Sequence, residues 1–171
     1  MDANLTLAGE LAACFADPLR FVLFAFPWGE QPDTKLVELQ EPWRSRYPGC
    51  RYGPDKWACQ LLDDIGAEVR KNAFDGRDAV PPLKYAVSSG HGIGKSALTA
   101  WLVCWVMATR PNCKGIVTAT TANQLETKTW AEIQKWMKKS IVADLFDIQA
   151  TSIRAKESPE SWRVDAITCK E

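Results

Sequence analysis

The sequence has little of what metal-binding and secreted folds need. It contains a single histidine, His91, and none of its six cysteines is spaced as a C-x-x-C pair. The ligand spacing typical of a zinc site is therefore absent. The first residues carry acids where a secretory signal carries bases, and Cys104 lies inside an apolar segment. These features favour reduced thiols over a disulfide framework.

An excess of one charge is also lacking. Acidic and basic residues number 21 each, so the whole chain offers no electrostatic argument for tight binding to nucleic acid or membrane. A nucleic-acid contact would need a local cluster. The most apolar run, residues 97–108, is about 12 residues long, against the roughly 20 that span a bilayer. We expect a buried helix there, no membrane contact and a cytoplasmic location.

The pattern of the first third predicts an N-terminal extension over residues 1–55. Leucines and Phe15 recur near helical spacing over residues 4–16, which predicts a helix. An aromatic and apolar stretch follows over 21–28. Residues 29–55 are rich in proline, glycine, arginine and acids without sustained periodicity, and they are predicted to form an extended arm or loop.

Residues 56–171 are predicted to form a second domain, of α/β class. It opens with an amphipathic helix whose apolar residues recur every four positions, at Trp57, Leu61, Ile65 and Val69. Strands alternate with helices further on, which predicts a parallel sheet with right-handed crossovers. The predicted elements are strand 85–88, helix 95–108, buried strand 115–119, helix 125–140, and strands 147–153 and 162–168.

The most specific motif is Ser89-Gly-His-Gly-Ile-Gly-Lys-Ser96, which follows the pattern G-x-x-x-x-G-K-[ST] between a strand and a helix. Glycines allow backbone N–H groups to line a concave nest for phosphate, and the helix directs its positive end there. Ser89 replaces the first glycine, as a tolerated variant. The simpler alternative is a flexible turn capped by Ser96. The predicted ATP-binding residues are Ser89, Gly90, His91, Gly92, Ile93, Gly94, Lys95 and Ser96.

Two of these residues carry predicted chemistry. Lys95 is the expected catalytic residue, because its ammonium would reach the β- and γ-phosphates of ATP. The Ser96 hydroxyl is the expected ligand of Mg²⁺. The predicted cofactors are therefore ATP and magnesium.

The segments around the loop resemble the ATPase domain of phage terminase large subunits. The strings SSGHGIGKSALTAWLVCWVMATRP and GIVTATTANQLETKTWAEIQKWMK carry the family's order of helix, "VTA-T-x-x-Q" strand end and tryptophan-bearing helix. Upstream, Asp17-Pro-Leu-Arg-Phe-Val, Phe26-Pro-Trp-Gly and Gly53-Pro-Asp-Lys-Trp57 are similar to its N-terminal region. The resemblance implies an incomplete P-loop NTPase sheet flanked by helices, and an ATP-driven translocase that packages viral DNA into procapsids.

The resemblance also implies partners: double-stranded DNA, a portal protein, a small terminase subunit and further copies in a homo-oligomeric ring, within the bacterial host cytoplasm. In the family, an apolar strand ending in Asp-Glu follows and supplies the acids for Mg²⁺ and water. The closest segment here, Arg163-Val-Asp165-Ala, lacks the apolar run and the second acid. We therefore expect ATP binding with poor hydrolysis. His91 stands where many members have arginine, and we expect it to shape the turn.

Further site residues follow by analogy with the family. Gln60 lies three positions after Trp57, whereas the family's adenine-reading glutamine directly follows an aromatic residue. It is either an adenine contact or a solvated helix residue. Polar residues after strand 115–119 would face the functional edge of the sheet as DNA or coupling contacts, or simply form a capping box. These are Thr118, Thr120, Thr121 and Gln124.

Two other functions stay open at this point. A small-molecule or nucleotide kinase would suit the length, but such kinases usually begin with the phosphate loop, whereas about half of this chain precedes it. The other is a non-catalytic prophage remnant or interaction module. An acceptor-substrate pocket would favour the kinase, and nucleotide binding without turnover would favour the remnant.

Overall fold

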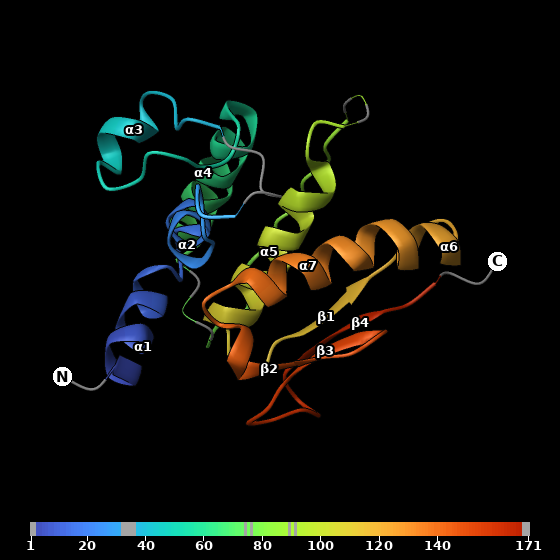
Figure 1. The fold of residues 1–171 in the computed structure, drawn as a ribbon. Helices are drawn as coiled ribbons and strands as arrows, with labels where there is room; N and C mark the ends of the chain where they lie inside the picture. The colour runs from blue at the N-terminus through green and yellow to red at the C-terminus, as the bar shows by residue number, and fades with distance from the viewer. Residues whose placement is uncertain are drawn as a thin grey trace. The chain divides into compact units, whose positions relative to one another are not determined.

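A computed structural model describes residues 3–31, 37–73, 75, 77–88, 90 and 92–168. The chain forms two compact units, here called the N-terminal unit (Met1–Ala86) and the C-terminal unit (Val87–Glu171). Figure 1 shows the helices and strands of both. Within the described residues, no helix combines the length and the apolar character that a membrane span requires.

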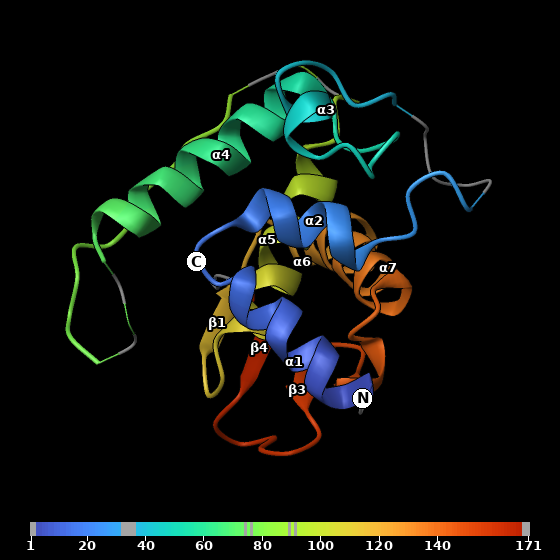
Figure 2. The same ribbon diagram turned by 90° about the vertical axis from the view of Figure 1, so that its left-hand side faces the viewer.

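The described residues of the N-terminal unit form four helices. Figure 2 shows these helices. α2 begins after Asp17, whose carboxylate accepts the Arg20 backbone N–H at 2.9 Å, and Pro18 occupies its first turn. An acidic N-cap followed by proline is a strong helix start, since both supply what the first turn lacks. α2 is largely buried and packs against α4. The four are α1 (Ala3–Ala13), α2 (Pro18–Ala25), α3 (Trp43–Arg46) and α4 (Lys56–Lys71).

The helices predicted in this unit exist, but the buried face of α4 differs from the predicted stripe. Trp57 and Leu61 are only half-buried, whereas Leu62 is fully buried. A spacing of strictly four residues drifts around a helix that turns every 3.6, so the buried face follows mixed steps of three and four. Its members are Ala58, Cys59, Leu62, Ile65, Gly66 and Val69.

The arm predicted over residues 29–55 contains more structure than a loop. α3 lies within it, and Glu38 and Tyr52 form an isolated antiparallel bridge. Trp43 is only 2% exposed, so the arm contributes a large side chain to the core of the unit. A four-residue helix without apolar periodicity leaves no pattern that a sequence window can detect.

The C-terminal unit places two long helical segments, which pack against each other, on a small sheet. Its fold class is mixed α/β, which confirms the predicted class at this level. The helices predicted over 95–108 and 125–140 are both present, the second with a π-helical stretch. Its elements are α5 (Lys95–Thr109), β1 (Lys114–Val117), α6 (Ala122–Gln124), η1 (Leu125–Trp130), α7 (Ala131–Lys139), η2 (Ala143–Leu145), β2 (Phe146–Ile148), β3 (Ser152–Ala155) and β4 (Arg163–Ala166).

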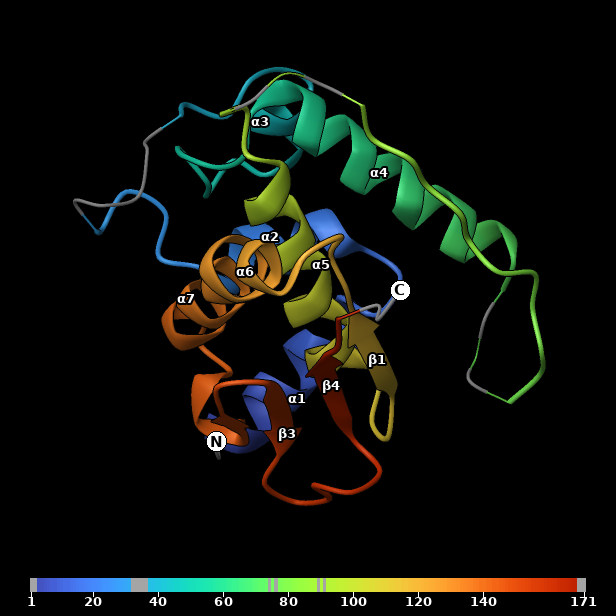
Figure 3. The ribbon, with the colours of Figure 1, turned by 90° about the vertical axis from the view of Figure 1, so that its right-hand side faces the viewer.

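The sheet has the order β1-β4-β3-β2 and is not wholly parallel (Figure 3). β1 pairs with β4 in parallel, but β4–β3 and β3–β2 are antiparallel. The single strand predicted over 147–153 is wrong, because a tight turn divides it. In that turn the Gln149 backbone N–H donates to the Ser152 carbonyl at 2.8 Å, which returns the chain antiparallel. The strand predicted over 162–168 is confirmed as β4.

One face of the sheet is covered by helices. Val117, Ile153 and Val164 are buried on that face, and the Trp162 indole N–H donates to the Met107 carbonyl of α5 at 2.9 Å. Ile116 points to the other face and is 70% exposed. A strand, β1, is thus present near the predicted 115–119, but the prediction that it is buried is wrong. Among the described residues, β1 is an edge strand covered on one face.

The strand predicted over residues 85–88 is not present. Tyr85 is 43% exposed, Val87 is 42% exposed, and no strand in the described part of the chain pairs with this segment. The apolar composition is that of a strand, but a strand forms only where a neighbour satisfies its backbone groups.

Candidate phosphate-binding loop

The turn before α5 has the backbone that a phosphate nest requires. Gly92 has φ of 81° and Gly94 has φ of 89°, both in the left-handed region. Residues other than glycine adopt this backbone region at a cost in free energy, so the glycine spacing of the motif has a direct conformational reason. Ser89 and His91 lie outside the described residues. Of the eight predicted ATP-binding residues, the structure describes Gly90, Gly92, Ile93, Gly94, Lys95 and Ser96.

The Lys95 side chain folds back across this turn. Its ammonium Nζ donates to the Gly90 carbonyl at 2.6 Å, five residues earlier in the chain. The contact joins the two ends of the loop and holds a positive charge over it. A phosphate that enters the loop thus meets a charged donor that is already close, which favours charge-assisted hydrogen bonds.

The start of α5 adds further donors. Gly94 is its N-cap residue, and the first helical bond runs from the Leu98 N–H to the Gly94 carbonyl at 3.0 Å. The N-cap residue, being glycine, makes no side-chain cap. The backbone N–H groups at a helix start and the helix dipole together favour an anion at this end.

Among the residues that the structure describes, no heavy atom other than those of the chain neighbours lies within 4 Å of a Cβ added at Gly90, Gly92 or Gly94. Ser96 is exposed in the first turn of α5, so its hydroxyl fits the role of a magnesium ligand. Magnesium bound with nucleotide takes most of its ligands from phosphate and water. No group of three or more His, Cys, Asp or Glu side chains that could hold a metal ion occurs among the residues described.

A second polar cluster follows β1. Thr121 caps the next helix by accepting the Gln124 backbone N–H at 3.2 Å, and the Thr120 hydroxyl donates to Gln124 Oε1 at 3.0 Å. Thr118 is exposed immediately after the strand. The structure thus brings the four predicted DNA or coupling residues to one end of β1, where three of them form a cap. Their role toward DNA stays a prediction.

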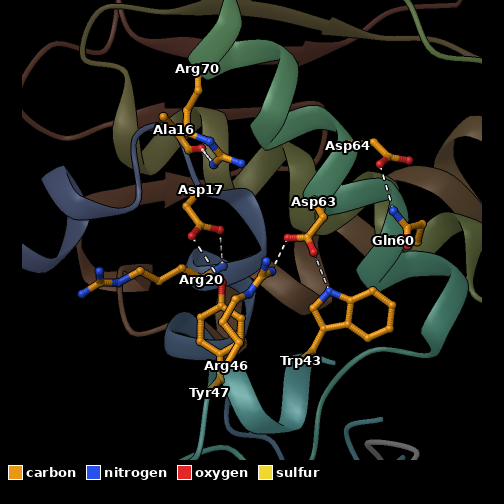
Figure 4. Close-up of polar contacts among 10 residues, drawn as sticks. All are labelled: Ala16, Asp17, Arg20, Trp43, Arg46, Tyr47, Gln60, Asp63, Asp64 and Arg70. Atoms are coloured by element: carbon orange, nitrogen blue, oxygen red, sulfur yellow. Dashed lines mark hydrogen bonds and ion pairs between the residues drawn. The ribbon is translucent and has the colours of Figure 1, made fainter. Parts of the chain in front are cut away.

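Gln60 lies on the exposed surface of α4, in the N-terminal unit. Its Nε2 donates to Asp64 Oδ1 at 2.9 Å, one helical turn further on (Figure 4). This pair is an ordinary contact between residues i and i+4 on a helix surface. An adenine contact by Gln60 stays a prediction.

Sequence patterns did not indicate the polar cluster beside α4 that Figure 4 shows. Asp63 Oδ2 accepts the indole N–H of Trp43 at 2.5 Å, and its other oxygen pairs with Arg46. Nearby, the Tyr47 hydroxyl donates to Asp17 Oδ2 at 3.2 Å, and burial together with Asp17 raises the pKa of Tyr47 to about 12. The partners are far apart in the sequence, so no local spacing of residues indicates these contacts.

Asp165 does not lie free to assist catalysis. The Arg163 Nε donates to Asp165 Oδ2 at 2.7 Å, and the guanidinium makes a second contact to the other carboxylate oxygen. Residues i and i+2 of a strand share one face, which is why the two meet. Asp165, the acid of the segment that most resembles the family's Asp-Glu strand, thus forms an ion pair with Arg163 on β4.

An apolar groove of about 420 Å³ runs between α5 and β1. It is separate from the glycine turn and lies along the open edge of the sheet. The side chains that line it are mainly aliphatic, among them Leu102, Val103, Val106, Ile116 and Val117.

The chain was compared with known protein families, curated proteins and solved structures, and nothing in any of the three comparisons matches it.

Proposed function

We propose that this protein binds MgATP through the loop Ser89–Ser96 and acts as the ATPase part of a terminase-type DNA-packaging motor. The observation that carries the proposal is the joint geometry at the start of α5. Two left-handed glycines, the N-terminus of α5 and the Lys95 ammonium over Gly90 converge on one turn. Each of these features favours an anion by itself, and a triphosphate engages all three.

In this proposal the chain's own groups hold and orient the nucleotide. Lys95 would lie close to the β- and γ-phosphates, and the first N–H groups of α5 would donate hydrogen bonds to phosphate oxygens. Ser96 ligates magnesium, which neutralises charge on the phosphates when it is bound. The sheet of the C-terminal unit then belongs to a P-loop NTPase fold, and double-stranded DNA, a portal protein, a small subunit and a ring of copies are its partners.

We expect turnover to be slow. Asp165 is held by Arg163, and the glutamate that would activate water in the family has no counterpart in the segment Arg163–Ala166. A missing general base lowers the rate by about 10²–10⁴-fold. This observation supports nucleotide binding without turnover as the second candidate. Phosphate release with and without double-stranded DNA separates a motor from a binding module.

Thermal unfolding tests the binding step. At a MgATP concentration of about 100 times Kd, binding stabilises the native state by roughly 2.7 kcal/mol, which raises Tm by roughly 5–10 °C. Lys95→Ala should remove most of that rise. Lys138→Ala is the matched control, because Lys138 is an exposed lysine at the end of α7. An unchanged Tm of the wild-type protein with MgATP would contradict the proposed function.

A further inference from the structure

Residues 83–88 expose apolar side chains at alternate positions. Leu83, Tyr85 and Val87 are 39%, 43% and 42% exposed. In an extended chain, alternate side chains point to one side, so these three share a face. Residues 79–86 run extended beside α4 (Figures 2 and 3), and among the described residues no hydrogen bond reaches the backbone of 83–88. A segment of this kind is suited to join the edge of a sheet.

β1 offers an open edge to such a segment. The Cys113 and Val117 carbonyls accept hydrogen bonds from the β4 side of the sheet, at 2.9 and 3.0 Å. Backbone groups alternate in direction along a strand, so those of Lys114 and Ile116 point away from β4. In the part of the chain that the structure describes, no strand lies on that side of β1.

The apolar groove of about 420 Å³ lies along this open edge. On α5 its lining runs from Thr99 to Met107, which is about 12 Å along the helix axis. Leu83 and Val87 are about 13 Å apart when the chain is fully extended. The apolar face of residues 83–88 therefore matches the groove in length and in chemistry, while the residues between would face water.

The orientation of the segment decides which copy of the chain supplies it. Within one chain, α5 connects residues 83–88 to β1, and a strand–helix–strand connection makes the two strands parallel. With the apolar face in the groove, parallel pairing sets Lys84 opposite Lys114 or brings Pro82, which lacks an N–H, into the ladder. Both are unfavourable. Antiparallel pairing places Lys84 opposite Ile116 and keeps the two lysines apart, but it needs a second copy.

We propose that residues 83–88 of one copy bind antiparallel along β1 of a second copy, with Leu83, Tyr85 and Val87 in the groove between α5 and β1. The contact names the surfaces through which copies of the chain associate. It goes beyond the proposed function, because it needs no nucleotide.

Disulfide cross-linking of the full chain tests the orientation. Antiparallel pairing brings Val87 to the start of β1, where Cys113 lines the groove. Under mild oxidation, Val87→Cys should give a covalent dimer in which mass spectrometry finds the new thiol bonded to Cys113. Leu83→Cys is the matched control, since Leu83 would lie at the other end of the groove. It should give at least about tenfold less of this bond, because a disulfide needs close Cα atoms.

Sedimentation of the full chain over a range of concentrations, without nucleotide, measures the association itself. Tyr85→Lys places a charge in the apolar groove and should raise the Kd of self-association by at least about tenfold. Ile141→Lys is the matched control, because Ile141 is 47% exposed and does not line the groove. It should leave this Kd unchanged.

Three results would overturn the inference. The wild-type chain stays a monomer at every concentration, the bond to Cys113 forms within one chain or forms equally with Leu83→Cys, or Tyr85→Lys associates as tightly as Ile141→Lys. The last result would place the contact between copies on another surface. Nucleotide binding is tested separately by the rise in Tm with MgATP, so either proposal can fail while the other stands.

Discussion

Asp63 on α4 offers a sharp test of how the N-terminal unit is held together. Its carboxylate accepts the indole N–H of Trp43 and pairs with Arg46. Trp43 is 2% exposed, so Asp63→Ala leaves a buried donor without an acceptor, which costs about 1–3 kcal/mol. The Arg46 side chain is 47% exposed, so loss of the ion pair adds only about 0.5–1 kcal/mol. We expect a total loss of roughly 1.5–4 kcal/mol in the free energy of unfolding.

Two further variants show which part of this loss comes from the indole. Asp63→Asn keeps an oxygen for Trp43 and should lose only about 1 kcal/mol. Asp64→Ala is the matched control, since the neighbouring carboxylate accepts a hydrogen bond from exposed Gln60, and it should change stability by about 0.5 kcal/mol or less. A double-mutant cycle of Asp63→Ala with Trp43→Phe should give a coupling energy of about 1–2 kcal/mol.

The assay is urea unfolding followed by far-ultraviolet circular dichroism, with native-state hydrogen exchange of the α4 amides as a local readout. The local readout matters because the chain has two compact units, which need not unfold together. Equal losses for Asp63→Ala and Asp64→Ala, within about 0.5 kcal/mol, would refute the reasoning.

Three other predictions concern the loop, a tyrosine and the thiols. Gly94→Ala places a residue with a Cβ at φ of 89° and should lower the free energy of unfolding in urea by about 1–2 kcal/mol. Gly90 does not have a positive φ, so Gly90→Ala should lower it less. The raised pKa of Tyr47, about 12, means that its stabilising contribution is complete below pH 10 and is lost as pH rises toward 12. Tyr47→Phe should therefore flatten the fall of Tm over that range, and an unchanged slope would contradict the assigned contact. Burial raises the pKa of the fully buried Cys104 thiol, so maleimide should label half-buried Cys50 at least about tenfold faster.

Long periodic segments of this chain are predictable from the sequence. The helices at Lys56–Lys71 and Lys95–Thr109 follow apolar patterns, and α5 ends one residue after the predicted end at 108. Strands are less predictable. Residues 85–88 have the composition of a strand and no partner among the strands described, and residues 147–153 divide into two strands at a turn. Composition states what a segment can form, whereas pairing depends on a neighbour elsewhere in the chain.

The candidate site divides in the same way. The glycine spacing and Lys95-Ser96 can be recognised in the sequence because each has a local conformational reason. Gly92 and Gly94 adopt the expected left-handed backbone. The contact of Lys95 with Gly90 closes a short loop and is local as well. By contrast, the pairing of Arg163 with Asp165 depends on β4 being a strand, since only then do the two side chains share a face.

The sequence by itself determined the elements whose cause is local: the amphipathic helices, the capped start of α2 at Asp17 and the glycine turn before α5. Tertiary structure decided the properties that need distant partners. It set the mixed sheet, the exposure of Ile116 on an edge strand, the role of Asp63 beneath Trp43 and the π winding of η1. The physical reason is that backbone preferences act over a few residues, whereas burial and hydrogen-bond pairing join side chains that only folding brings together.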